Sequence, residues 1–153
     1  MPQEADLNTK DWPSLACTCL RLRKLTRRVT QLYDQIMEPC GLTGQQFGLL
    51  SNLRRNPGIS VGDLAVILAM DPTTLTRLLR PLEQKGFVAI VAPKEDRRRR
   101  VLKLTDVGLD ALKAAYPLWK QAQLGLAEKL GPEDYAAFQS SLDHALDHFT
   151  QLA

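Results

Sequence analysis

The stretch that decides the fold runs from Ser60 to Thr105 and reads SVGDLAVILAMDPTTLTRLLRPLEQKGFVAIVAPKEDRRRRVLKLT. It begins with two helix N-cap patterns, Ser60 with Asp63 and Asp71 followed by Pro72. An N-cap side chain accepts a hydrogen bond from a free backbone N–H of the first turn, and proline fits at the first helical position. The sequence therefore predicts two short helices joined by a tight turn.

The second of these helices has two contrasting faces. One face carries apolar side chains at i, i+3, i+4 and i+7, which predicts burial, namely Leu75, Leu78, Leu79 and Leu82. The other face repeats this spacing with hydroxyls and guanidiniums, namely Thr73, Thr76, Arg77 and Arg80. Pro81 cannot donate a backbone hydrogen bond to the carbonyl of Arg77, so we expect a kink or a loosened turn there.

A hairpin is predicted after the second helix, because residues 87–91 and 101–104 are mostly apolar and β-branched on either side of a charged turn. Two helices followed by a basic hairpin are typical of a winged helix-turn-helix, which lays its second helix in the major groove of DNA. Base edges or phosphates would then be contacted by Thr73, Thr74, Thr76, Arg77 and Arg80. The arginines of the turn, Arg97, Arg98 and Arg99, would reach the minor groove or flanking phosphates.

Four further helices are predicted around this stretch, over residues 15–36, 43–56, 105–130 and 132–153. The first and the last two carry apolar seams that exceed what a monomeric domain needs, which indicates a dimer. We expect a mainly α-helical protein with six helices and a small β-hairpin wing. Its predicted parts are an N-terminal dimerisation helix (1–40), a winged helix-turn-helix lobe (41–105) and C-terminal dimerisation helices (106–153).

Composition excludes several other classes. The net charge of +3 is too small to indicate DNA binding by itself, but the basic residues crowd into 21–28 and 77–103. Cys17, Cys19 and Cys40 are an odd count in a chain without an export signal or a long apolar run, so we expect free thiols, a cytoplasmic location and no membrane contact. No catalytic motif is present, and His144 and His148 lack further metal ligands nearby, so we expect no enzyme, metal or cofactor.

The run DLAVILAMDPTTLTRLLRPLEQKGFV, followed by Asp96-Arg97-Arg98 and by Leu104-Thr105 with Gly108, resembles the signature of the MarR family, the multiple antibiotic resistance regulators of bacteria and archaea. The resemblance implies a homodimer, built from the first, fifth and sixth helices, on a pseudo-palindromic operator. It usually implies a repressor that is released by a small ligand or by oxidation. It also implies that Arg98 enters the minor groove and that Asp96 helps to hold the wing.

Two kinds of effector remain open. Cys19, counted back from Thr43, occupies the place of the reactive cysteine in the branch of this family that senses organic hydroperoxides, and Tyr33 matches a tyrosine of that branch. A second tyrosine expected there is replaced by Arg23, and the last two helices contain no cysteine. The competing effector is a small aromatic or anionic molecule, for which the predicted pocket residues are Trp12, Arg23, Tyr33, Phe47, Tyr116 and Trp119.

An alternative function is a helical protein–protein interaction module without sequence-specific DNA binding. It accounts for the apolar seams but gives no role to the threonines and arginines of residues 73–80 or to the wing arginines. A steep dependence of DNA binding on salt would favour the DNA-binding hypothesis, because phosphate contacts release counterions.

Overall fold

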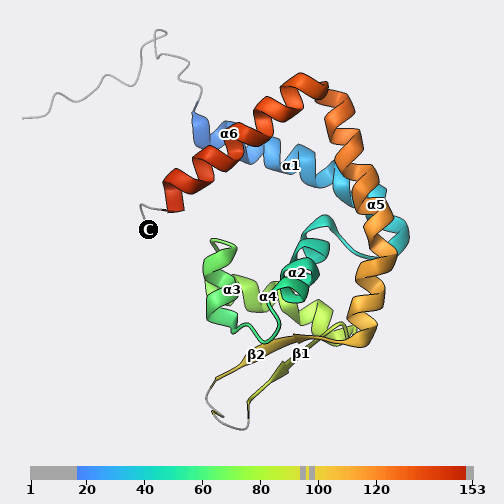
Figure 1. Cartoon of the computed structure of the whole chain (residues 1–153), viewed down its shortest axis with the longest axis vertical. Coiled ribbons are helices and arrows are strands. Elements are labelled where there is room, and N and C mark those ends of the chain that lie inside the picture. Colours follow the sequence, from blue (N-terminus) through green and yellow to red (C-terminus); the bar gives the residue numbers. More distant parts are fainter. Residues whose placement is uncertain (1–16, 94–95, 97–98, 151–153) are drawn as a thin grey trace, which may run out of the picture.

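The computed structural model describes residues 17–93, 96 and 99–150. The six predicted helices and the predicted hairpin are all present (Figure 1). They are α1 (Thr18–Met37), α2 (Gly44–Arg55), α3 (Val61–Ile67), α4 (Pro72–Gln84), β1 (Val88–Val91), β2 (Val101–Leu104), α5 (Asp106–Leu130) and α6 (Pro132–Thr150), with a 3-10 turn at Glu38–Cys40 between α1 and α2.

The helix starts follow the N-cap patterns of the sequence. Each of the four predicted cap side chains accepts a hydrogen bond from the backbone N–H three residues later, which satisfies a donor that the helix itself leaves free. The N–H of Gln46 donates to Thr43, that of Asp63 to Ser60, that of Thr74 to Asp71 and that of Gly108 to Thr105. Local sequence therefore sets where α2 to α5 begin.

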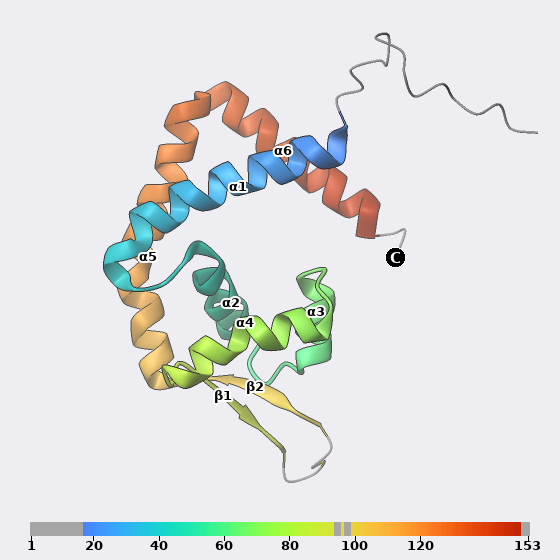
Figure 2. The same ribbon diagram turned by 180° about the vertical axis from the view of Figure 1, so that it is seen from behind.

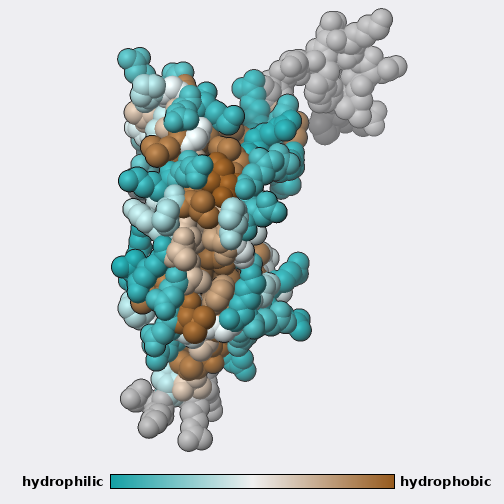
Figure 3. Space-filling view, turned by 90° about the vertical axis from the view of Figure 1, so that its right-hand side faces the viewer, coloured by the Kyte–Doolittle hydropathy of each residue, from teal (hydrophilic) through white to brown (hydrophobic). Residues whose placement is uncertain are grey.

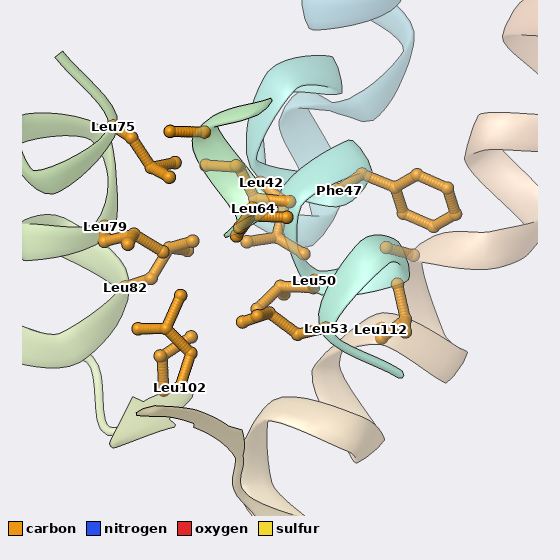
Figure 4. Close-up of a cluster of buried hydrophobic side chains, with 14 of the residues drawn as sticks. Leu42, Phe47, Leu50, Leu53, Leu64, Leu75, Leu79, Leu82, Leu102 and Leu112 are labelled. Carbon is orange, nitrogen blue, oxygen red and sulfur yellow. The ribbon is translucent and has the colours of Figure 1, made fainter. Parts of the chain in front are cut away.

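The hydrophobic core lies where α2, α3, α4, the hairpin and the first half of α5 meet (Figure 4). The predicted apolar face of α4 points into it: Leu75, Leu79 and Leu82 are buried and Leu78 is half-buried. α4 continues past Pro81 to Gln84, and the N–H of Lys85 donates to the carbonyl of Pro81 at 3.1 Å. Helical hydrogen bonding therefore resumes after the proline.

The hairpin is fixed to the helices at both of its strands. β1 and β2 pair antiparallel, from Val88 with Leu104 to Val91 with Val101. The N–H of Leu102 donates to the carbonyl of Ile59 at 2.8 Å, which ties β2 to the segment before α3. On the other side, a Cβ built on Gly108 would lie 2.1 Å from the carbonyl oxygen of Phe87, so only glycine fits where α5 begins. These contacts hold the wing against the helix-turn-helix.

The terminal helices are much less buried than the lobe. α5 leads away from the core, and α1 packs against α5. α6 turns back from the far end of α5 (Figures 1 and 2). Met37 is the only buried residue of α1, and α6 contains none. Within the described ranges, no helix has both the length and the apolar character needed to cross a membrane.

Candidate nucleic-acid interface

The face of α4 that points away from the core is polar. Thr73, Thr76, Arg77 and Arg80 are exposed, and Thr74 is half-buried. The hydroxyl of Thr76 donates to the carbonyl of Pro72 at 2.8 Å, so its oxygen still has a free lone pair for an outside donor. Arg77 and Arg80 form no ion pair with any residue that the structure describes. Their guanidinium groups are available to phosphates or to a guanine edge.

Asp71 fixes the first turn of α4. One carboxylate oxygen accepts from the N–H of Thr74 at 2.8 Å. Hydrogen bonds from Thr74 favour the ionised carboxylate and hold the pKa of Asp71 below its usual range. The ionised side chain also lies at the positive end of the helix dipole, which stabilises it further. The polar face of α4 therefore starts from a defined position.

The described part of the wing turn contains Asp96 and Arg99, both exposed, whereas Arg97 and Arg98 lie outside the described residues. The backbone N–H of Arg99 donates to the carbonyl of Asp96 at 3.1 Å. The guanidinium of Arg99 lies 3.7 Å from a carboxylate oxygen of Asp63 on α3. Sequence reasoning used Asp63 only as part of a helix cap and missed this contact, because it joins segments that are 36 positions apart.

The wing and α4 lie at the same end of the molecule. The hairpin extends from the bottom of the lobe, next to α4, in both ribbon views (Figures 1 and 2). Leu82 of α4 and Leu102 of β2 both belong to the buried cluster. One rigid core therefore carries the helix and the hairpin, which suits a protein that contacts two neighbouring grooves.

A hollow with a volume of about 670 Å³ lies between α2 and α5, apart from the polar face of α4. Trp119 stacks on Phe47 at a ring-centroid distance of 5.2 Å and on Tyr116 at 5.8 Å. The lining includes three cations, Arg54, Arg55 and Lys113. We call this hollow the aromatic cleft. The sequence predicted the three rings but none of the three cations.

The other three predicted pocket residues lie elsewhere. Tyr33 lines a smaller hollow of about 320 Å³ together with Val29, Thr30, Gly44 and Gln45. Arg23 is exposed on α1 and is not part of the lining of either hollow. Trp12 lies outside the described residues. The five described residues of the predicted set are therefore divided between different parts of the molecule.

The thiols have different surroundings. Cys17 and Cys19 are exposed at the start of α1, and Cys40 is half-buried with its thiol 2.9 Å from the carbonyl of Met37. Burial, with a smaller contribution from Tyr135, raises the pKa of Tyr33, so its hydroxyl keeps its proton at neutral pH. Cys19 and Tyr33 are about 21 Å apart along the axis of α1. They cannot interact within one chain.

The last helix carries two neighbouring imidazoles, whose planes are tilted by 41°. The rings of His144 and His148 lie one turn apart, with their centroids at 4.3 Å. In the part of the chain that the structure describes, no group of three or more His, Cys, Asp or Glu side chains is placed to hold a metal ion.

Together, the exposed Thr and Arg face of α4 and the hairpin beside it define a winged helix-turn-helix protein. Residues 41–99 match the sequence model of the MarR family. This match covers less than half of the chain, so it is the segment 41–99 that is similar to MarR-family proteins. The likeness in fold extends beyond this segment, since a crystal structure of MarR superposes with a TM-score of 0.73 at 22% identity, covering 94% of this chain and 95% of that chain.

Curated proteins that are similar to this chain are named as transcriptional regulators. The transcriptional activatory protein BadR of Rhodopseudomonas palustris is 36% identical over 91 residues, which are 58% of this chain and 52% of that protein. The organic hydroperoxide resistance transcriptional regulator of Bacillus subtilis is 27% identical over 133 residues, or 87% and 89% of the two chains. The transcriptional repressor CouR, solved on a 23-mer DNA duplex, superposes with a TM-score of 0.77 at 28% identity, covering 86% and 93%. This chain spans only 43% and 52% of the length of two of its curated relatives.

Proposed function

We propose that this chain is a sequence-specific DNA-binding transcriptional regulator, which works in the cytoplasm as a homodimer on a pseudo-palindromic operator. The observation that carries the proposal is α4, whose leucines are buried while Thr73, Thr76, Arg77 and Arg80 stay exposed beside the hairpin. A buried face fixes the helix to the lobe, and an exposed face of hydrogen-bond donors matches the acceptors of a major groove.

The proposed division of labour follows from side-chain chemistry. Arg77 and Arg80 would read guanine or contact phosphate. The threonine hydroxyls would donate hydrogen bonds to phosphates, or donate to and accept from base edges. The wing arginines, with Arg98 foremost, would enter the flanking minor groove, and Asp96 would help to hold the turn. Because Asp63 lies within 3.7 Å of Arg99, that arginine would exchange one anion for another on binding DNA.

The proposed dimer uses residues 1–40 and 106–153, outside the DNA-binding lobe of 41–105. Large apolar side chains remain exposed on all three helices concerned, namely Leu20, Leu22, Leu25, Tyr116, Leu124, Leu130, Leu146 and Phe149. A band of apolar residues also runs along the face that α5 presents, between hydrophilic flanks (Figure 3). Exposed apolar surface of this extent is typical of an interface.

The test is selection of retained sequences from a random pool of short duplexes by the purified protein. We expect an inverted repeat, and we expect Arg77→Ala to weaken its enrichment and Arg98→Ala to abolish it. Lys120→Ala removes an exposed cation from α5, outside the winged helix-turn-helix lobe, and serves as the matched control. An unenriched pool with a shallow salt dependence would contradict the proposal and favour the protein–protein interaction module.

The aromatic cleft supports a ligand as effector, and we propose a small aromatic carboxylate that releases the protein from DNA. A planar ring would stack on the exposed side of the three aromatic rings of the cleft, where Tyr116 is 53% exposed, and Arg54, Arg55 and Lys113 would meet its charge. Thiol oxidation at Cys19 is the alternative, because this thiol is exposed to solvent.

Thermal shift measurements separate the two effectors. Phenolic acids should stabilise the wild-type protein, whereas cyclohexanecarboxylate, which keeps the charge without the aromatic ring, should stabilise it less. Arg55→Ala should remove the shift, and Cys19→Ser should keep it. If phenolic acids give no shift, and if peroxide releases the wild-type protein but not Cys19→Ser from DNA, oxidation is the signal and the cleft is not the effector site.

A further inference from the structure

The connection between α1 and α2 joins the terminal helices to the winged helix-turn-helix lobe. It starts with the 3-10 turn Glu38–Cys40 and continues through Gly41, and the side chains on either side, Met37 and Leu42, are buried in the core. Gly41 has a left-handed backbone, with φ at +67°, and its N–H donates to the carbonyl of Glu38 at 3.0 Å. The connection is therefore short and held in one conformation. We call residues 38–43 the α1–α2 joint.

Two contacts fix α1 to the start of α2, directly after the joint. A carboxylate oxygen of Asp34 on α1 accepts a hydrogen bond from the N–H of Gly44 at 2.9 Å. This N–H belongs to the first turn of α2, where a helix leaves its donors free. A Cβ built on Gly44 would lie 3.0 Å from the Cβ of Tyr33, so the two helices touch closely here. A rotation of α1 against α2 would break both contacts.

A third contact reaches the joint from α4, the proposed DNA-reading helix. Lys85 directly follows the last residue of α4, and its ammonium donates to the carbonyl of Gly41 at 2.9 Å. The same ammonium lies 5.9 Å from the centroid of the Phe87 ring, which favours this orientation of the side chain. Among the residues that the structure describes, Lys85 forms no ion pair. Lys85 thus links the C-terminal end of α4 directly to the α1–α2 joint.

The lobe is attached to the terminal helices at two places. One is the start of α5, where Gly108 lies against the hairpin, and the other is the α1–α2 joint. The buried leucines of α4 fix this helix within the lobe. By contrast, Asp34 and Lys85 act across the boundary between the lobe and α1. These two polar side chains therefore determine how firmly α4 is oriented relative to the terminal helices.

This orientation matters for a twofold dimer on DNA. A rotation of each lobe about its joint moves α4 and its symmetry mate in opposite directions, which changes the distance between the two reading helices. Half-sites on successive turns are about 10 base pairs apart, so one additional base pair moves a half-site by about 3.4 Å and turns it by about 35° around the duplex. A protein that rejects such a change needs firmly oriented lobes.

We propose that Lys85 is a positioning residue that sets the half-site spacing of the operator, with Asp34 as its counterpart on α1. The inference rests on the proposed homodimer on a pseudo-palindromic operator and adds a determinant of specificity that touches no base. Lys85 acts through the exposed side chains of α4, whose distance from the dimer axis it fixes. Loss of its hydrogen bond leaves the reading face intact but lets each lobe rotate.

Spacing variants of the operator test this role. The duplexes are the inverted repeat recovered by selection and two versions with one base pair inserted or removed between the half-sites. The wild type should bind the selected spacing on the order of a hundredfold more tightly than either altered spacing. Lys85→Met removes the donor but keeps the length of the side chain. It should reduce this ratio on the order of tenfold, because a hydrogen bond is lost in both subunits.

Three further variants separate positioning from other effects. Lys85→Arg keeps a donor at the end of the side chain and should retain the wild-type ratio. Asp34→Ala removes the acceptor on α1 and should relax the spacing as Lys85→Met does. Lys120→Met removes an exposed lysine of α5 that forms no ion pair in the described ranges, and it should change nothing. Urea midpoints near that of the wild type show that each variant is folded.

The outcomes distinguish this inference from the proposed function. A wild-type protein that is monomeric, or that selects no inverted repeat, would overturn the proposed function and the inference together. A wild type that selects one spacing, with an unchanged ratio in Lys85→Met, would overturn the inference alone. Equal weakening of all three duplexes by Lys85→Met, with a shallower salt dependence, would assign Lys85 to a phosphate contact and would also overturn the inference.

Discussion

The winged helix-turn-helix lobe and the terminal helices differ in how they obtain their stability. In the lobe, buried hydrophobic residues run from Leu42 to Leu102, and every predicted helix cap is made within the chain. In α6 no residue is buried, and α1 buries only Met37. Apolar burial is the main favourable term in folding. The comparison indicates that the lobe is complete in one chain, whereas the terminal helices leave apolar surface for the proposed second copy.

The largest expected effect lies in the lobe. Leu79→Ala should lower the free energy of unfolding by about 4 kcal/mol, because this α4 side chain is 1% exposed and its removal leaves a cavity. Urea denaturation measures the change. The transition in which the lobe unfolds should not depend on protein concentration, because its core lies within one chain. A loss below about 1 kcal/mol would show that the core of the lobe is looser than its burial indicates.

Gly108→Ala should cost about 3 kcal/mol, because the added Cβ would collide with the backbone carbonyl of Phe87 and push α5 from the hairpin. Gly48→Ala is the matched control in α2, since nothing lies within 4 Å of its added Cβ. That control should stabilise the protein by about 0.5 to 1 kcal/mol, as alanine favours helix over glycine. Equal effects of the two substitutions would contradict the close contact between α5 and β1.

The terminal helices should respond differently. Leu146→Ala combined with Phe149→Ala should leave the urea midpoint of the lobe unchanged, because both side chains are mostly exposed in one chain. The dimer dissociation constant should rise on the order of tenfold through lost apolar burial. Sedimentation at several concentrations measures it. A lobe midpoint that falls while the dimer persists would reverse the comparison between the two regions.

The smallest effect concerns pH. Because the folded-state pKa of Asp71 is depressed, its contribution to stability is present above the unfolded value of about 4 and is lost as the pH falls through the folded value. Asp71→Asn keeps a good cap without the titration, so the difference between wild type and variant should shrink on acidification. Urea midpoints between about pH 3 and pH 6 test this. A constant difference would assign the acid sensitivity to other carboxylates.

The sequence correctly predicted the features that depend on residues close together along the chain. Cap side chains at Thr43, Ser60, Asp71 and Thr105 mark the helix starts, and the leucine spacing of α4 identifies its buried face. Both signals lie within a few residues of the structure that they specify. For the same reason the six helices, the hairpin and the winged helix-turn-helix were predicted correctly.

Features that depend on tertiary packing were not predicted. The cations of the aromatic cleft, Arg54, Arg55 and Lys113, come together only because α2 packs on α5, and no spacing in the sequence records that contact. The pairing of Asp63 with Arg99 also depends on how the wing folds back on α3. The roles of Thr73, Arg77, Arg80 and the wing arginines in DNA binding stay predictions.

Equilibrium binding of the wild-type protein and Arg77→Ala to the selected duplex and to a scrambled duplex of equal composition tests the central claim most directly. We predict that the wild type prefers the selected duplex at least about a thousandfold at physiological salt. Arg77→Ala should weaken binding to the selected duplex by about 1 to 3 kcal/mol and change binding to the scrambled duplex much less. Equal affinity of the wild type for both duplexes would contradict a sequence-reading role for α4.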